Sequence, residues 1–179
     1  MGILGEFDPI ADGVDLRVGG WVAPVVECEV AAIIDRDVPP TVSAEDVHQY
    51  VAAWAPAFEF ANIDSPPSDV AAVLAGNIFH RGYRLGPEDP SATVADLTSR
   101  TATVVIDSDV THVTDLTALT GDLAEVLART AWLAPHAGRP VQRGDVVLTG
   151  SIVVPIPVRP GSCISYELEG FAAMEVRVA

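Results

Sequence analysis

Lysine is missing from this chain of 179 residues, whose 10 basic residues are all arginines and are outnumbered by 25 acidic residues. Without lysine, Schiff-base chemistry, a lysine general base and a phosphate-binding P-loop are excluded. The net charge of −15 makes the surface strongly acidic. Such a surface repels phosphate backbones and anionic lipids, so neither nucleic acids nor membrane surfaces are expected partners.

Long apolar runs and paired cysteine motifs are also missing. No apolar run reaches the roughly 18 residues of a membrane span. The two cysteines, Cys28 and Cys163, lie far apart and form no CxxC or Cys/His metal pattern. The first residues include Glu6 and Asp8 and no basic segment, which does not fit a secretory signal peptide. A reducing cytoplasm is therefore the expected location.

The composition that is present indicates a globular domain. Hydrophobic residues make up 49% of the chain, which excludes intrinsic disorder. Glycine and proline are spread along the chain without a linker, so residues 1–179 are expected to form one domain. Most of the predicted elements are strands. The expected fold class is therefore α+β, with a mixed β-sheet curled into a barrel and a few flanking helices.

The predicted elements follow from hydrophobic periodicity and from turn and capping residues. Strands are predicted over 25–34, 57–61, 77–85, 101–106, 109–113, 146–151, 152–158, 163–168 and 172–178, with 101–106 and 109–113 paired. Helices are predicted over 44–54, 66–75 and 120–137. The first helix is predicted because Ser43 begins a near capping box, and Pro56 follows its end. The last is predicted to begin with Thr120 as its N-cap and to stop at Gly138.

Two glutamates separated by one residue stand out in the apolar segment 25–34. In a strand, Glu27 and Glu29 point to the same face, and Cys28 points to the opposite one. Two carboxylates so close in a low-dielectric site cannot both stay ionised unaided. Either one of them is protonated or a cation lies between them. The alternative is an edge strand on which both glutamates face water, since solvated acids are common on strands.

Glu59 is a third acidic residue inside an apolar segment predicted to be a strand. Three carboxylates on apolar strands, in a chain without lysine, suit a hard divalent cation. Oxygen ligands favour Mg²⁺ or Mn²⁺ over Zn²⁺. The predicted metal ligands are therefore Glu27, Glu29 and Glu59, although an arginine could instead neutralise one of them.

Beyond these glutamates, the chain contains further short motifs, among them P-A-F-E at 56–59 and G-D-V-V-L-T-G-S at 144–151. Together with the P-V-V-E-C-E-V-A segment they resemble the fumarylacetoacetate hydrolase superfamily, in particular its 2-hydroxypenta-2,4-dienoate hydratase and 4-oxalocrotonate decarboxylase branch. The matching segments are 24–31, 55–59, 74–77, 131–134, 144–151 and 159–161. The resemblance covers nearly the whole chain from Gly5 onward.

This resemblance implies that Glu27, Glu29 and Glu59 bind Mg²⁺ or Mn²⁺, which would hold the 2-oxo acid end of a small substrate. It also implies that the turn containing Thr149 and Ser151 lies near the substrate carboxylate. The implied activity is that of a divalent-metal-dependent lyase or hydratase acting through the enolate of a small 2-oxo or 2-hydroxydienoic acid. A shortened biosynthetic variant that dehydrates, decarboxylates or cyclises its substrate fits equally well.

The chain departs from the family pattern in its proton-transfer groups. Family members carry a lysine in an N-terminal helical segment that precedes the part matched here, and Gly76 replaces the acid of the family's A-D-N motif. Asp64 or His80 is therefore expected to move protons, with Asp64 ahead because it closely follows the third metal ligand. Arg81 or Arg84 is expected to bind a substrate carboxylate. A purely structural His80 and arginines that only face solvent are the alternatives.

Two hypotheses about function remain open at this point. One is the metal-dependent enzyme, and the other is a non-catalytic homologue or accessory subunit that keeps the metal pocket. Three mutually repelling buried acids cost several kcal/mol without a cation, which favours the enzyme. If the N-terminal segment is absent, apolar surface on the barrel is exposed, so a homo-oligomer is expected.

Overall fold

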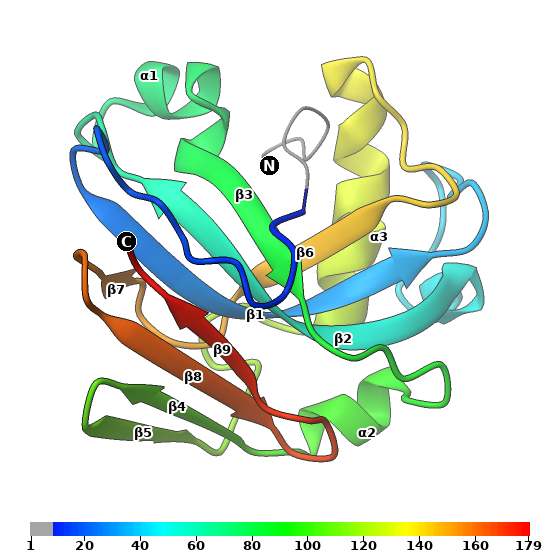
Figure 1. Ribbon diagram of the computed structural model, residues 1–179. Helices are drawn as coiled ribbons and strands as arrows, with labels where there is room; N and C mark the ends of the chain where they lie inside the picture. The colour runs from blue at the N-terminus through cyan, green and yellow to red at the C-terminus, as the bar shows by residue number, and fades with distance from the viewer. Residues whose placement is uncertain (1–8) are drawn as a thin grey trace.

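A computed structural model describes residues 9–179. The residues Gly5, Glu6 and Asp8, used above for the extent of the resemblance and for the signal-peptide argument, lie outside this range. Two β-sheets make up most of the described chain, and α1 and α3 lie on the side of the first sheet that faces away from the second (Figure 1). No helix among the described residues is both long enough and apolar enough to cross a membrane.

The first sheet carries the glutamates. In order, it contains β3 (His80–Leu85), β2 (Val51–Asn62), β1 (Pro24–Ile34) and β6 (Val146–Ser151), and β7 (Ile156–Pro157) also pairs with β1. The central strand β1 therefore has hydrogen-bonded neighbours on both sides, β2 on one and β6 and β7 on the other.

The second sheet contains four strands from the second half of the chain. In order they are β5 (Asp109–Val113), β4 (Ala102–Ile106), β8 (Cys163–Leu168) and β9 (Met174–Arg177). The predicted pairing of 101–106 with 109–113 is confirmed. The α+β class is also confirmed, but every ladder between the named strands is antiparallel, so the sheets are not mixed. No pairing within 9–179 closes either sheet into a barrel.

The helices are short except for one. They are α1 (Val70–Ala75), α2 (Val94–Thr98) and α3 (Leu123–Leu133), with 3₁₀ turns η1 (Val47–Tyr50), η2 (Asn77–Phe79) and η3 (Ala134–Ala137). The predicted helix 120–137 is divided between α3 and η3. Its N-cap is Asp122, whose side chain accepts a hydrogen bond from the Glu125 N–H at 3.0 Å, and not Thr120.

The core lies between the two sheets. One face of β1 is fully apolar there, because Val26, Cys28 and Val30 all have no exposed surface. Tyr166 on β8 packs against Phe58 on β2 with 6.0 Å between ring centroids. This packing fixes which face of β1 points into the core. Because successive side chains of a strand point to opposite faces, the glutamates lie on the other face.

The predicted helix over 44–54 is wrong. Its start signal is real, since the Asp46 N–H donates to the Ser43 hydroxyl oxygen at 3.1 Å. Only the single turn η1 follows, because residues from Val51 onward pair with β1. Pro56 lies inside β2, just beyond the point where the ladder with β3 ends at Ala57. A proline is tolerated where a strand has no ladder partner for its missing N–H.

The other differences from the predicted elements are smaller. Within the predicted strand 152–158 only Ile156–Pro157 forms a strand, although the Ile152 and Val158 N–H groups also donate to β1 carbonyls. Pro155, just before this strand, has no N–H to donate. Residues Asn77–Phe79 form a 3₁₀ turn before β3, and β9 is shorter than 172–178. The helix α2, with a capping box between Thr93 and Asp96, was not predicted.

Arg84 connects the first sheet to the segment 10–14 and to β9. The residue is 2% exposed, and its guanidinium donates to the backbone carbonyls of Glu175 (2.7 Å), Ile10 (3.3 Å) and Val14. The expectation that it binds a substrate carboxylate is therefore not supported, because its donors are already engaged with the backbone.

Replacing Arg84 with leucine is expected to lower the free energy of unfolding by about 2–5 kcal/mol, because buried carbonyl oxygens lose their donors. Urea denaturation followed by circular dichroism measures the change. Arg177→Leu is the matched control, since this arginine is exposed and forms its ion pair with Glu175 at the surface. Equal denaturation midpoints for the two variants would contradict a structural role for Arg84.

Candidate active site

The three predicted metal ligands converge on one face of the first sheet. Glu27 on β1 lies directly opposite Glu59 on β2, and Glu29 is two residues further along the same face of β1. One carboxylate oxygen from each of the three lies within 4.8 Å of the others. The two-residue periodicity of β1 and the register with β2 thus produce the cluster that the sequence predicts.

Burial makes this cluster electrostatically costly. Glu29 is only 1% exposed. Burial, and then the charge of Glu59, raise the pKa of Glu27 to about 7 and raise the pKa of Glu29 well above its usual range. The alternative of an edge strand with both glutamates facing water is wrong, because β1 is central in its sheet and Glu29 is buried.

A backbone N–H and a histidine side chain lie within hydrogen-bond distance of the cluster. The backbone N–H of Gly150 donates to Glu29 Oε2 at 2.7 Å, and His80 Nδ1 lies 2.7 Å from Glu59 Oε1. Gly150 has a φ of +101°, which the bulged β6 needs at this point. Between residues 9 and 179 no arginine forms an ion pair with the three glutamates. The converging oxygen donors, with Glu29 buried and Glu27 and Glu59 half-buried, therefore fit a hard divalent cation.

A β-bulge decides which residue of β3 faces the cluster. Tyr83 lies opposite Glu59 and Gly82 opposite Phe60, but the next partner of β2, Ala61, lies opposite His80. Arg81 is the extra residue at this bulge. Without it, two-residue periodicity would place Arg81 on the side of Tyr83 and Glu59, and His80 on the other. The bulge instead brings His80 to the cluster, where it is 1% exposed.

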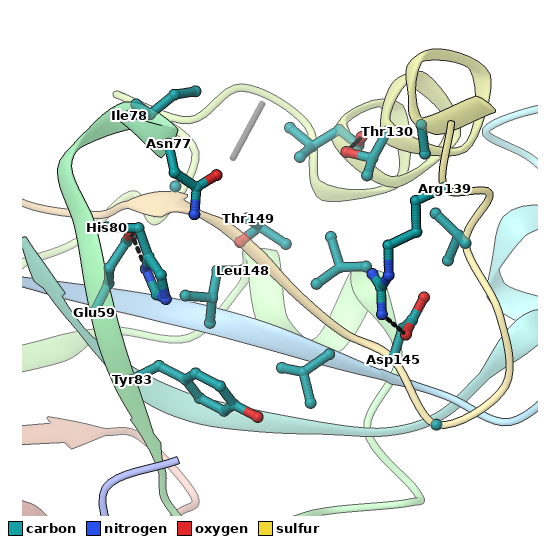
Figure 2. A pocket seen from close by; sticks show the side chains of 17 residues that line it. Glu59, Asn77, Ile78, His80, Tyr83, Thr130, Arg139, Asp145, Leu148 and Thr149 are labelled. Carbon is teal, nitrogen blue, oxygen red and sulfur yellow. Dashed lines mark hydrogen bonds and ion pairs between the residues drawn. The ribbon is translucent and has the colours of Figure 1, made fainter. Parts of the chain in front are cut away.

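A cavity of about 480 Å³ opens over this face of the sheet, beside α3 (Figure 2). Glu59, His80 and Tyr83 line one side of it, and Arg139 and Asp145 line the other, with Leu148 and Thr149 between them (Figure 2). The walls come from β2, β3, β6, η2, α3 and the loop before β6. A small organic molecule placed here would lie directly beside the carboxylate cluster.

Comparison with known proteins identifies the family. The family described as fumarylacetoacetate (FAA) hydrolase C-terminal matches residues 9–179. The chain belongs to this family. The resemblance inferred from the Glu-x-Glu segment and from the G-D-V-V-L-T-G-S segment, most of which forms β6, is therefore confirmed.

Individual relatives are distant in sequence. A 4-oxalocrotonate decarboxylase of a Pseudomonas species is 23% identical over 169 residues, which is 92% of this chain and 64% of the relative. A 2-hydroxyhexa-2,4-dienoate hydratase of Comamonas testosteroni is 26% identical over 187 residues, 99% of this chain and 69% of the relative. The chain therefore spans about two thirds of the length of these relatives.

The fold is shared with several solved structures. The 4-oxalocrotonate decarboxylase from Pseudomonas putida G7, complexed with magnesium and adipate, superposes with a TM-score of 0.82 at 20% identity. The match covers 94% of this chain and 65% of that one. A fumarylpyruvate hydrolase from Pseudomonas aeruginosa, in complex with Mn²⁺ and pyruvate, superposes with a TM-score of 0.68 at 17% identity.

The other predicted site residues of this family member lie in different places. Thr149 lines the cavity, although its hydroxyl donates to the Val30 carbonyl at 2.8 Å. Ser151 is not among the residues that line the cavity, and its hydroxyl donates to the Val153 carbonyl at 2.6 Å. A direct contact of Ser151 with a substrate carboxylate is therefore less well supported than one of Thr149.

Asp64 and Arg81 lie outside the cavity lining and contact each other. Arg81 Nη2 donates to Asp64 Oδ2 at 2.6 Å, and the Asp64 side chain is 37% exposed. Each therefore neutralises the other at a partly exposed position. This arrangement does not favour the expected roles of Asp64 in proton transfer and of Arg81 in carboxylate binding.

Sequence analysis missed several cavity residues, notably Tyr83, Arg139 and Asp145. No periodic pattern marks Arg139 and Asp145, because they belong to the irregular segment between η3 and β6. Asn77 and Ile78 also line the cavity. The sequence pattern predicts a strand over 77–85, but β3 begins only at His80. Asn77, Ile78 and Phe79 have φ angles of 54–66°, a conformation unusual for residues other than glycine.

The cluster predicts how stability depends on pH in the metal-free protein. The folded pKa of Glu27, about 7, lies above its unfolded value of 4.5, so the folded state binds the proton more tightly. Raising the pH through this window therefore favours unfolding, and the contribution of Glu27 levels off above about pH 7. Thermal melts between about pH 5 and pH 8 in EDTA should show a falling Tm.

Two comparisons test the origin of this slope. Saturating Mg²⁺ should raise the Tm most at the upper end of the range, because bound carboxylates must be ionised. Glu27→Gln should flatten the slope in EDTA, since it removes one of the titrating groups. A slope that survives in Glu27→Gln and is insensitive to Mg²⁺ would assign it to general charge repulsion in this acidic chain.

Proposed function

We propose that this chain carries the catalytic pocket of a divalent-metal-dependent lyase or hydratase, which acts through the enolate of a small 2-oxo or 2-hydroxydienoic acid. The observation that supports this most directly is the set of three carboxylates converging within 4.8 Å beside a cavity large enough for a small acid. The names of the two relatives above, a decarboxylase and a hydratase, agree with this class of chemistry.

The proposed cofactor is Mg²⁺ or Mn²⁺, held by Glu27, Glu29 and Glu59. Hard oxygen donors and the absence of thiolate or imidazole among the three ligands favour these ions. When bound, such a cation supplies Lewis-acid stabilisation of the negative charge that develops on the oxygen of a 2-oxo acid. The Gly150 N–H and His80 hold two of the carboxylates in position through the hydrogen bonds described above.

His80 is proposed as the proton-transfer group in place of Asp64. Its imidazole lines the cavity and contacts Glu59, and histidine is the side chain that most often serves as a general acid or base. Asp64 is paired with Arg81 and lies outside the cavity lining. The order of preference drawn from sequence spacing, with Asp64 ahead, is therefore reversed.

Proton exchange at C3 of a 2-oxo acid tests the proposal without knowledge of the final reaction. Enolisation removes a C3 proton, so 2-oxoadipate in D₂O should exchange its C3 hydrogens faster with protein and Mg²⁺ than with either alone. Proton NMR follows the loss of the C3 signal, and EDTA should abolish the acceleration. Metal-dependent binding of 2-oxoadipate without any exchange would favour the non-catalytic homologue. No binding would overturn both the enzyme and the non-catalytic homologue.

Assembly and location stay predictions. The helix α1 contains no buried residue, and Val70 and Leu74 on it are 64% and 58% exposed, which supports the proposed homo-oligomer. Light scattering coupled to size-exclusion chromatography measures the mass in solution, and a monomer would contradict this proposal. The cytoplasmic location rests on the sequence alone.

A further inference from the structure

The backbone of His80 lies at the end of a strand ladder. His80 belongs to the edge strand β3, and its pair with Ala61 is the last one between β3 and β2. The three residues before it have the positive φ angles described above. Backbone at the end of a ladder opens more easily than backbone in its middle. Proton transfer nevertheless requires that the imidazole stay in place beside Glu59, where Figure 2 shows it.

The side chain of Arg81 bonds directly to this backbone. Arg81 Nη1 donates to the His80 carbonyl oxygen at 2.8 Å, and Arg81 Nη2 donates to Asp64 Oδ2 at 2.6 Å. Arg81 is also the extra residue of the bulge that turns His80 toward the cluster. Asp64 lies in the loop two residues beyond the end of β2. One guanidinium, with donors in a fixed planar arrangement, therefore joins the bulge to the neighbouring strand's loop.

Asp64 is in turn held by a buried side chain. Asn62, the last residue of β2, is 6% exposed, and its Oδ1 accepts the N–H groups of residues 22 and 23 at 2.8 and 3.0 Å. The Asp64 N–H donates to the Asn62 carbonyl at 2.9 Å, and Asn62 Nδ2 lies 3.5 Å from Asp64 Oδ2. A series of hydrogen bonds therefore runs from a buried position through the ion pair to the bulge.

Neither substrate binding nor stability accounts well for this ion pair. The side chains of Arg81 and Asp64 are 24% and 37% exposed, and ion pairs at such positions contribute little to stability. Neither residue lines the cavity. What the pair does contact is the carbonyl of the residue whose imidazole faces Glu59.

We propose that Arg81 is a positioning residue, which together with Asp64 forms a clamp that holds the bulge and keeps the His80 imidazole beside Glu59. The clamp rests on the proposed function and adds to it the groups that orient its proton-transfer residue. It acts through His80 and touches neither the substrate nor a proposed metal ligand. Loss of the clamp should therefore slow proton transfer while the metal site and the fold persist.

Arg81→Ala tests the clamp. At saturating Mg²⁺ and 2-oxoadipate, C3 exchange should slow by about 10–100-fold, the effect of displacing a reacting group by about 1 Å. The Mn²⁺ affinity should fall by less than about 10-fold, since losing a group that supports a metal ligand costs about 10–100-fold. A loss of Mn²⁺ affinity as large as the loss of exchange would assign Arg81 to the metal site and overturn the clamp.

Arg36→Ala is the matched control. Arg36 is exposed, forms an ion pair with Asp35 and does not line the cavity, so its variant loses the same kind of interaction away from the bulge. It should exchange C3 protons at the rate of the unmodified protein. An exchange rate in Arg81→Ala equal to that of Arg36→Ala would overturn the clamp and leave the proposed function standing.

The ring signal of His80 reports on the clamp without any activity. In carbon–proton NMR spectra of the Mg²⁺-loaded protein, the histidine ring signal that disappears in His80→Gln identifies His80. This signal should shift or broaden in Arg81→Ala and stay unchanged in Arg36→Ala. An unchanged signal in Arg81→Ala would overturn the clamp. If the unmodified protein neither binds 2-oxoadipate nor accelerates its exchange, the proposed function fails, and the ring signal alone decides whether Arg81 positions His80.

Two substitutions of Asp64 distinguish the clamp from proton transfer by this carboxylate, and they replace Arg81→Ala if that variant does not fold. Asparagine keeps an oxygen that accepts from Arg81, whereas alanine does not. Asp64→Ala should therefore slow exchange by about 10-fold or more, and Asp64→Asn by only a few-fold. Equal losses in the two variants would assign the effect to the charge of Asp64, and no loss in Asp64→Ala would show that the ion pair positions nothing. Either result would overturn the clamp.

Discussion

Replacing Glu29 with glutamine is expected to lower the affinity for Mn²⁺ by more than about 100-fold. Loss of a group that only supports a metal ligand already lowers metal affinity by about 10–100-fold, and Glu29 is itself a proposed ligand. Glutamine has nearly the same shape and can still accept the Gly150 N–H. The loss would therefore come from the missing charge at the centre of the cluster. Titration calorimetry with Mn²⁺ measures it directly.

The same variant should behave in the opposite way without metal. Burial and the neighbouring carboxylates disfavour the ionised form of Glu29, so removing its charge should raise the Tm in EDTA at pH values near neutral. The Tm increase caused by Mg²⁺ should then disappear. Glu167→Gln, at an exposed position of β8, is the control and should change neither measurement. Normal metal affinity in Glu29→Gln would exclude the cluster as the metal site.

Replacing His80 with glutamine is expected to slow C3 exchange of 2-oxoadipate by about 10²–10⁴-fold, the usual contribution of a general acid or base. Glutamine retains a donor for Glu59 but cannot take up and release a proton at neutral pH. The Mn²⁺ affinity should fall by no more than about 10–100-fold, since His80 contacts a ligand and is not itself one in the proposed set. NMR exchange rates at saturating Mg²⁺ separate the two effects.

Asp64→Asn provides the comparison for His80. Because Asp64 pairs with Arg81 outside the cavity lining, its variant should exchange C3 protons within a few-fold of the unmodified protein. A large loss in Asp64→Asn together with full activity in His80→Gln would restore the assignment based on sequence spacing. Full activity in both would mean that neither side chain transfers the proton.

The three residues of the carboxylate cluster and the family could be predicted from the sequence. Glu27 and Glu29 share a face of β1 because side chains alternate along any strand, and the apolar residues around them require that strand to be buried. Glu59 follows the same logic on β2. These are local properties of short segments, so they could be predicted without knowing how the segments pair.

The rest of the site depends on contacts between segments that are distant in the sequence. The residues after Val51 form a strand because β1 offers them a partner, which outweighs the local capping signal at Ser43. The bulge at Arg81 turns His80 toward Glu59, and a shift of one residue reverses every side chain beyond it. Arg139 reaches the cavity from an irregular loop, whose path depends on packing between α3 and β6 rather than on any periodic pattern. Pairing register and loop path are set by contacts between distant segments, and for that reason they could not be read from the order of residues alone.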